Sequence, residues 1–154
     1  MIENGLIIAM YIIIFFIYTF FGAVFEHMSY YAGDTHKILN NPVITGFPVY
    51  GFGALLVYWL IKKIGITSAP AMFATGAVTG TIIEYIVGRW IAHAGKYDQS
   101  ENEPGIIKSW DYRNEPFNID GIISLRHFMT WGIAGVVVGK LTPILETHIK
   151  RALI

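Results

Sequence analysis

The stretch that decides the fold is LIIAMYIIIFFIYTFFGAVF, residues 6–25, in which no side chain carries a charge. Two further uncharged stretches follow, at residues 38–61 and 64–83. About 20 residues of helix cross the hydrocarbon core of a bilayer, and each stretch reaches that length. All three are too long and too uniformly apolar for barrel strands, which alternate over about 10 residues. The chain is therefore expected to be an all-α integral membrane protein.

The composition of the whole chain agrees with this class. Of its 154 residues, 54% are hydrophobic and 14% are charged, whereas a soluble domain carries about 25% charged residues. The apolar content excludes a disordered chain, and the net charge of zero disfavours a nucleic-acid partner. The chain contains no cysteine, which excludes disulfides, thiol catalysis and thiolate metal sites. A single transmembrane domain, residues 1–154, is expected.

Four membrane-spanning helices are expected, at about residues 6–29, 48–64, 69–93 and 121–140. The first is expected to be retained, because it is too long for a signal peptide and has bulky residues at its exit. Residues 40–53 hold two prolines and three glycines, which favours a broken entry to the second span. The tail, residues 142–154, is too short to cross and is expected to form an interfacial helix or a bent extension of the fourth span.

The distribution of lysine and arginine predicts the orientation. With four spans, the N-terminus, the second connection and the C-terminus share one side of the membrane. That side carries more basic than acidic residues, its basic ones being Lys62, Lys63, Lys140, Lys150 and Arg151. We therefore expect a multi-pass protein of the inner (cytoplasmic) membrane with both termini in the cytoplasm. The connections at about 30–47 and 94–120 would then face outward.

Among the ionisable residues inside the expected spans or near their ends, Glu26, Glu84 and Arg126 stand out as site candidates. A charge at membrane depth costs at least about 2.5–3.5 kcal/mol, so such groups normally face protein or water. Glu84 and Arg126 should both lie roughly 10 Å below the outer surface, judged by helix rise, which predicts an ion pair between them. Two interpretations stay open. The charges form a site for a solute, ion or proton, or they lock the third and fourth spans together.

The histidines give little support for metal binding or catalysis. No two of the five histidines are four residues apart, so a helical metal pair is not predicted. Glu84, His127 and Asp111 could supply an acid, a base and an orienting group, but the sequence holds no serine elbow, no HExxH and no motif-like pair of acids. We expect no catalytic residue, no metal and no cofactor, and an enzyme is the least favoured class.

Glycines recur on the third and fourth spans at four-residue spacing. Small residues in this pattern let a neighbouring helix backbone approach closely, within one chain or between copies. Glu84 stands on the same stripe as the glycines of the third span, so it is expected to face a helix contact rather than lipid. Five glycines are expected to serve helix packing: Gly76, Gly80, Gly88, Gly135 and Gly139.

Several short segments occur in a characteristic order along the chain. They are GAVFE at 22–26, GFPVYGFG at 46–53, EY at 84–85, WDY at 110–112, PFNI at 116–119 with Gly121, and WG at 131–132. In that order they resemble the bacterial CmpB-like family of ABC-transporter type IV permeases, over about residues 15–145. The resemblance implies a few apolar helices with a polar Trp-Asp-Tyr loop before the last span. It carries over to Glu26, Glu84, Trp110, Asp111, Tyr112 and Asn118.

The chain departs from this family's pattern at two places. Arg113 stands where members tend to have serine, and Arg126-His127 stand where members tend to be uncharged, so no role is carried over to Arg126. The sequence also holds no GxxxxGK[ST] motif. Any nucleotide-binding subunit would therefore be a separate partner.

Two functions are weighed for this chain. The first is a permease-like or channel-like transport component that binds a polar solute or ion at an outer-leaflet acidic site built from Glu26, Glu84, Trp110, Asp111, Tyr112, Asn118 and Arg126. The second is a non-transporting membrane subunit or scaffold, whose charges lock helices and whose Trp-Asp-Tyr loop docks a partner or lipid. Expected partners are the lipid bilayer, further copies of the chain or other membrane subunits, and a separate nucleotide-binding subunit if ATP drives transport.

Overall fold

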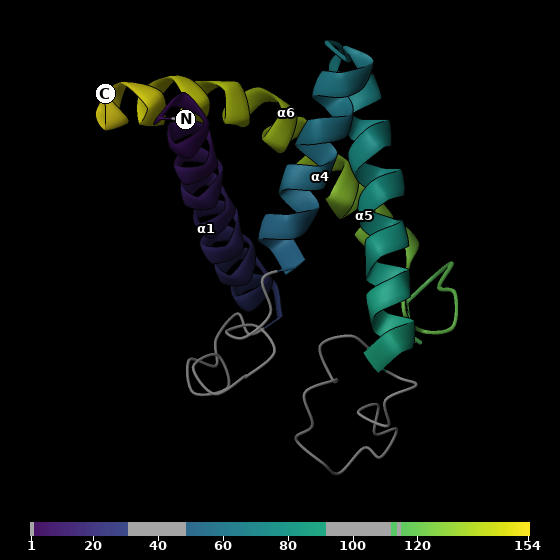
Figure 1. Cartoon of the computed structure of the whole chain (residues 1–154). Helices are drawn as coiled ribbons and strands as arrows, with labels where there is room; N and C mark the ends of the chain where they lie inside the picture. Colours follow the sequence, from purple (N-terminus) through teal and green to yellow (C-terminus); the bar gives the residue numbers. More distant parts are fainter. Residues whose placement is uncertain (1, 31–48, 92–111, 114) are drawn as a thin grey trace.

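The structure, a computed structural model, describes residues 2–30, 49–91, 112–113 and 115–154, except for the side chains of residues 2–3, 26–30 and 91. These residues form four helices and no strand: α1 (Ile2–Tyr30), α4 (Val49–Ile64), α5 (Ala69–Ile91) and α6 (Leu125–Leu153). Figure 1 shows α4 and α5 as an antiparallel pair, with α1 on one side and α6 packed across them. The all-helical architecture expected from the sequence is confirmed.

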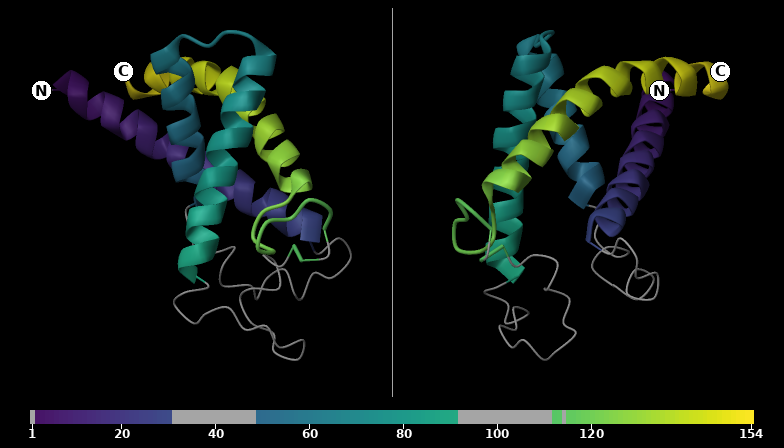
Figure 2. Two further views of the ribbon diagram at one scale, coloured as in Figure 1. Left: turned by 90° about the vertical axis from the view of Figure 1, so that its right-hand side faces the viewer. Right: turned by 180° about the vertical axis from the view of Figure 1, so that it is seen from behind.

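The two ends of the molecule are formed by different segments of the chain (Figures 1 and 2). The first turns of α1, the turn between α4 and α5, and the last turns of α6 lie together at what we call the terminal end. The last turns of α5, residues 115–124 and the start of α6 lie at the opposite end, the loop end. That both ends of the chain share one side of a membrane stays a prediction, and so does the identity of the end that faces the cytoplasm.

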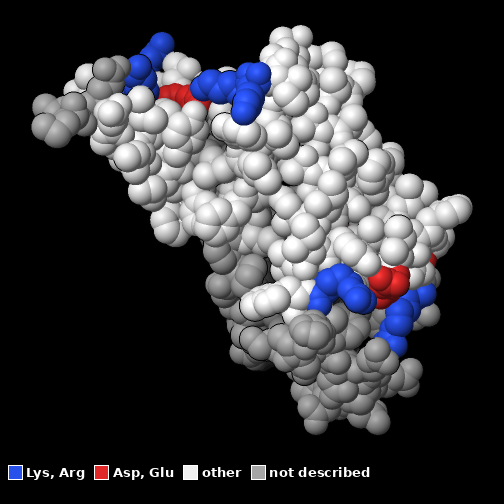
Figure 3. All heavy atoms as spheres, turned by 45° about the vertical axis from the view of Figure 1, so that its right-hand side comes forward, with Lys and Arg blue, Asp and Glu red and all other residues white. Residues whose placement is uncertain are grey.

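Between the two ends, the surface is apolar. On the face drawn in Figure 3, the charged side chains lie at the two ends and uncharged atoms lie between them. Phe16 and Phe20 of α1, Ile86 of α5 and Ile133 of α6 each expose more than half of their surface. A soluble monomer rarely exposes apolar side chains on this scale. The belt is the surface that lipid tails cover in a membrane protein.

Three of the described helical segments are long and apolar enough to cross a membrane: Asn4–Phe25, Ala69–Trp90 and Leu125–Leu153. The remaining helix, α4, has 16 residues and is about 24 Å long at 1.5 Å per residue, which is short of a hydrocarbon core of about 30 Å. The fourth span, expected at 48–64, therefore stays a prediction. The broken entry expected before it falls mostly outside the described residues.

One face of α1 meets the rest of the protein, although the helix is apolar on all sides. Met10, Ile14 and Tyr18 recur at four-residue spacing and are buried, in a core shared with α4 and α6. The Tyr18 hydroxyl and the Thr142 hydroxyl of α6 are hydrogen-bonded at 2.8 Å. The other faces of α1 are left for lipid.

The helices α5 and α6 cross where Gly76 and Gly135 meet. A Cβ added at Gly76 would lie 2.5 Å from the Gly135 Cα and 2.6 Å from the Trp131 carbonyl oxygen, so the crossing has no room for a side chain. Gly80 lies under the Trp131 ring, and Gly139 packs against α5. The glycine stripes thus meet within one chain, which leaves their expected role between copies of the chain without support.

The last helix is continuous from Leu125 to Leu153 and contains Pro143. The expectation of a separate interfacial helix at 142–154 is therefore wrong, and the chain instead forms the bent extension that was the alternative. Figure 2 shows α6 changing direction along its length. Proline lacks the N–H that would bond four residues back, which bends a helix without ending it. The bend carries the C-terminal turns of α6 toward the first turns of α1.

Candidate functional site

Residues 115–124 form a tight loop that leads into α6 at the loop end. Its backbone turns sharply, since Phe117, Asp120 and Gly121 have positive φ angles of 55°, 56° and 67°. The Tyr112 N–H donates to the Gly121 carbonyl at 2.8 Å. This bond brings Tyr112, just before the loop, against its far side, so the loop has a defined shape before α6 begins.

Asn118 is the side chain that holds this loop together. Its Nδ2 donates to the carbonyl oxygens of Glu115 at 2.9 Å and Arg113 at 3.2 Å. Its Oδ1 accepts from the Gly121 N–H at 3.2 Å. Asparagine suits a turn because its short amide can bond to nearby backbone groups. The contacts give Asn118 a loop-building role.

Ile122 fixes the loop onto α5. It is buried, and its side chain fills the space that a Cβ at Gly88 would take. Gly88 therefore makes room for the loop, whereas Gly76 makes room for a helix. On the surface beside it, the Tyr85 hydroxyl donates to the Asp120 carboxylate at 2.8 Å, which adds a second, exposed contact between α5 and the loop.

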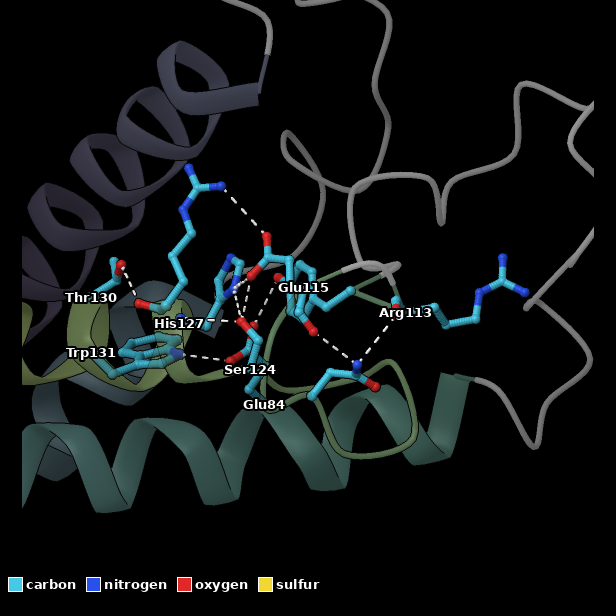
Figure 4. A network of polar contacts seen from close by, with 10 residues as sticks. Glu84, Arg113, Glu115, Ser124, His127, Thr130 and Trp131 are labelled. Carbon is cyan, nitrogen blue, oxygen red and sulfur yellow. Dashed lines mark hydrogen bonds and ion pairs between the residues drawn. The ribbon is translucent and has the colours of Figure 1, made fainter.

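Glu84 lies beneath this loop, between α5 and α6, with 6% of its surface exposed. The Tyr112 hydroxyl donates to its Oε1 at 3.0 Å, and the Trp131 indole N–H donates to its Oε2 at 3.0 Å (Figure 4). A buried carboxylate is tolerated where hydrogen bonds or charges replace water. One carboxylate thus ties together α5, α6 and the residue that precedes the loop.

The Trp131 ring joins three helices. It lies over Gly80 of α5 and stacks on the Tyr50 ring of α4, with centroids 6.2 Å apart and planes at 24°. The ring fills the apolar helix contact while its N–H donates to the Glu84 carboxylate, so both the apolar and the polar part of this half-buried side chain find partners.

A second polar cluster surrounds Glu115 at the start of α6 (Figure 4). Ser124, the N-cap of α6, donates its hydroxyl to Glu115 Oε2 at 2.5 Å. Because this uses the only hydroxyl proton, the His127 ring must donate from Nδ1 to the Ser124 oxygen, at 2.9 Å. The Arg126 guanidinium lies 3.4 Å from the other oxygen, Glu115 Oε1.

The two clusters form one network, since the Tyr112 and His127 rings stack with centroids 3.7 Å apart and planes at 14°. Exposure rises along this loop network, from 6% for Glu84 to 15% and 22% for the His127 and Glu115 side chains and 68% for Arg126. Within the described ranges, no three His, Asp or Glu side chains gather as ligands for a metal ion. The network leads from a buried carboxylate to an exposed guanidinium.

The predicted ion pair between Glu84 and Arg126 is wrong in its partners. Arg126 pairs with Glu115, and Glu84 accepts from Tyr112 and Trp131. The reason is that Arg126 lies nearer the membrane surface than the sequence predicted. Because α6 begins at Leu125 rather than at residue 121, Arg126 lies in its first turn, where a long side chain can reach water at little cost.

Of the other residues predicted for the site, Tyr112 lies with Glu84 as a direct hydrogen-bond partner. Asn118 lies in the loop, where its amide bonds to backbone groups of Arg113, Glu115 and Gly121. The Glu26 side chain and the whole of Trp110 and Asp111 lie outside the described residues.

Sequence reasoning missed three members of the network: Trp131, Glu115 and Ser124. Ser124 carried a usable signal, because a serine directly before an apolar run favours a helix N-cap. Trp131 stands on α6 next to Gly132, and a large ring beside small residues is a natural complement to a glycine stripe. Glu115 gave no such signal, since its partners depend on the path of the loop backbone.

Apolar helices of spanning length, an exposed apolar belt and charged side chains gathered at the two ends define a helical integral membrane protein. The chain belongs to the family described as Putative ABC-transporter type IV, whose profile matches residues 13–153. This confirms the resemblance seen in the sequence and marks the chain as a membrane protein related to transport. No curated protein and no solved structure matches the chain.

Proposed function

We propose that the chain is a permease-like component of a transport system, in which Glu84 locks the loop end and the exposed rim of the loop network contacts a polar solute. The match to the Putative ABC-transporter type IV family supports the transport part of the proposal, and the enclosure of Glu84 supports its role as a lock. Both of its oxygens accept hydrogen bonds from the chain at 3.0 Å, in a buried position. Because both oxygens already accept hydrogen bonds and the side chain is buried, the lock is favoured over direct solute binding at Glu84.

The rim of the network suits solute contact better than its buried part. Arg126 is 68% exposed and stands 3.4 Å from Glu115, which is long for a charge-assisted hydrogen bond. An exposed ion pair of this kind contributes about 0–1 kcal/mol. Either residue can therefore give up this ion pair and bind an incoming polar group instead, at a small cost in free energy. The proposal also assigns Glu26, Trp110 and Asp111 to this site, and this part rests on the sequence alone.

The test is purification of the tagged chain from its native membrane in mild detergent, followed by measurement of ATP hydrolysis. The chain itself has no nucleotide-binding motif. Hydrolysis in the purified sample, together with a stoichiometric subunit that carries such a motif, is the expected result. A chain that purifies without an ATPase subunit, and whose removal from the cell alters the uptake or export of no solute, would contradict the proposal.

A second candidate function is the non-transporting scaffold, which the same enclosure of Glu84 favours. In this case the loop network serves only to hold residues 112–124 in place for a partner. The purification separates the two candidates, because a scaffold would bring a stoichiometric membrane partner that lacks ATPase activity.

The proposal includes a location. We place the chain in the inner membrane with four spans, the terminal end in the cytoplasm and the loop end outside. The excess of lysine and arginine on the predicted cytoplasmic side supports this orientation.

A further inference from the structure

At the terminal end, far from the loop network, Glu146 of α6 gathers donors from two other helices. The Tyr11 hydroxyl of α1 donates to its Oε1 at 2.6 Å, and the Tyr58 hydroxyl of α4 donates to its Oε2 at 2.9 Å. The Lys62 ammonium lies 3.4 Å from Oε1. The negative charge of Glu146 is thus already compensated within the chain.

Beside Glu146 lies a groove of about 690 Å³, between the first turns of α1 and the last turns of α6. One part of its wall is apolar and includes Leu6, Ile7, Met10 and Leu153, and the other part is polar and includes Glu146 and Thr147. The volume falls in the range of about 300–1,000 Å³ that is usual for small-molecule sites. The bend of α6 creates the groove, because it swings the C-terminal turns over toward α1 (Figure 2).

Two lysines stand on the polar side of the groove, Lys62 from α4 and Lys150 from α6. The Lys62 side chain is 59% exposed even though it contacts Glu146, and Lys150 is exposed on the last turns of α6. Because one of the two lysines balances the Glu146 carboxylate, the other leaves this side of the groove with a net positive charge. Figure 3 shows lysine and arginine atoms on both sides of acidic atoms at this end of the molecule.

We propose that this groove binds an anionic phospholipid, with an acyl chain along the apolar walls and the phosphate between Lys62 and Lys150. The combination decides the occupant. The walls need an apolar chain, the rim needs an anion, and the place is the end of membrane-crossing helices, where bilayer lipids present both groups together. Basic side chains at a membrane surface attract anionic headgroups in the same way. The inference stands independently of the proposed function.

The test uses the full chain in a neutral detergent and follows its thermal unfolding. Phosphatidylglycerol should raise the Tm by about 5–10 °C when it is at about 100 times its dissociation constant. Phosphatidylcholine and inorganic phosphate should each raise it much less, since one lacks the net charge and the other lacks the acyl chain. An equal rise with either of these would overturn the proposal.

Substitutions test whether the lipid binds in this groove. Lys150→Gln, which removes an exposed side chain, should lose at least half of the shift produced by phosphatidylglycerol. Lys140→Gln is the matched control, because Lys140 is also an exposed lysine of α6 but does not line the groove. Ile7→Trp should fill the apolar part and reduce the number of phosphatidylglycerol molecules retained in native mass spectra. Full retention of the shift in Lys150→Gln, or an equal loss in Lys140→Gln, would show that the lipid binds elsewhere.

Discussion

Two carboxylates hold opposite ends of this molecule by the same chemistry. Glu84 and Glu146 each accept hydrogen bonds from aromatic side chains of other segments, and their aromatic donors are Tyr112 and Trp131 for the first and Tyr11 and Tyr58 for the second. An aromatic donor brings a polar hydrogen on an apolar ring, so it satisfies the acid and fills the helix contact together. This is how a chain with few charged residues can keep acids at its helix contacts.

Replacing Glu84 by glutamine should lower the free energy of unfolding by about 1.5–3 kcal/mol, because a neutral amide offers one acceptor oxygen where the carboxylate offers two. Thermal unfolding in detergent measures the loss. Tyr85→Phe is the control, since it removes an exposed hydrogen bond of the neighbouring residue and should leave the Tm close to that of the parent. An unchanged Tm in Glu84→Gln would show that the carboxylate is not a lock.

A double-mutant cycle between Glu84→Gln and Tyr112→Phe should show that the two residues act together. We expect a coupling free energy of about 0.5–3 kcal/mol, as for residues in one hydrogen-bond network. The same cycle between Glu84→Gln and Tyr18→Phe should show no coupling, because Tyr18 bonds to Thr142 in the core with α1. Additive effects of the first pair would argue against the contact.

Arg126→Gln should separate function from stability. Its side chain is exposed, so the loss of its ion pair should change the free energy of unfolding by less than about 1 kcal/mol. If Arg126 contacts the solute, the same substitution should lower transport-coupled ATP hydrolysis several-fold in the purified assembly. Arg89→Gln is the matched control, because Arg89 is also an exposed arginine at the loop end, at 60% against 68% for Arg126. Equal activity in the parent and the Arg126 variant would remove Arg126 from the proposed site.

At the scale of elements, the pair α5–α6 is the centre of the fold. The two helices make the most extensive contact of any described pair, because glycines let their backbones meet at the crossing. Trp131 then fills the space beside the crossing, above Gly80. The loop at 115–124 completes the pair by closing over α5 through Ile122 and Gly88. Glycine spacing and the loop therefore serve one purpose, which is to hold α6 close to α5.

Gly76→Ala should destabilise the protein by about 1–3 kcal/mol, the usual range for overpacking a core. The added Cβ would meet backbone atoms of Gly135 and Trp131, which cannot rotate away as a side chain can. Gly5→Ala is the control, since a Cβ at that helical position has no atom within 4 Å. Alanine is favoured over glycine in a helix, so this control should unfold at the same temperature as the parent or higher. A Gly76→Ala variant as stable as the control would contradict the close crossing.

At the scale of the whole molecule, the helices separate two polar ends by an apolar belt. The loop network lies at one end, and Glu146 with the cationic groove lies at the other. The first turns of α1, the α4–α5 turn and the last turns of α6 share the terminal end (Figure 1). This arrangement requires α4 to run back across the thickness of the molecule, even though it is shorter than the other helices.

The absence of cysteine makes the orientation easy to test by single-cysteine labelling. Ile119→Cys in the exposed loop should react with a membrane-impermeant thiol reagent in intact spheroplasts. Ser68→Cys in the α4–α5 turn should react only after the membrane is permeabilised. Asn4→Cys, near the start of α1, should behave like Ser68→Cys. If Ser68→Cys reacted in intact spheroplasts while Asn4→Cys did not, α4 would not cross the bilayer and the fourth span would be lost.

The sequence by itself determined the class, the family and most helix positions. Long uncharged runs can be stable only as helices in lipid, because every backbone group must be bonded within its own segment. Such information is local, so it can be read along one chain. For the same reason, α4 and α5 began within a residue of the expected positions, at Val49 and Ala69.

Only the tertiary structure decided which polar groups meet. The sequence placed Glu84 and Arg126 at similar depth, but a shift of four residues in the start of α6 moved Arg126 to the rim and left Trp131 as the donor to Glu84. The C-terminal turns belong to the same helix as the last span, because Pro143 bends α6 without breaking it. Partners across helices depend on small displacements in three dimensions, which residue spacing along one helix does not contain.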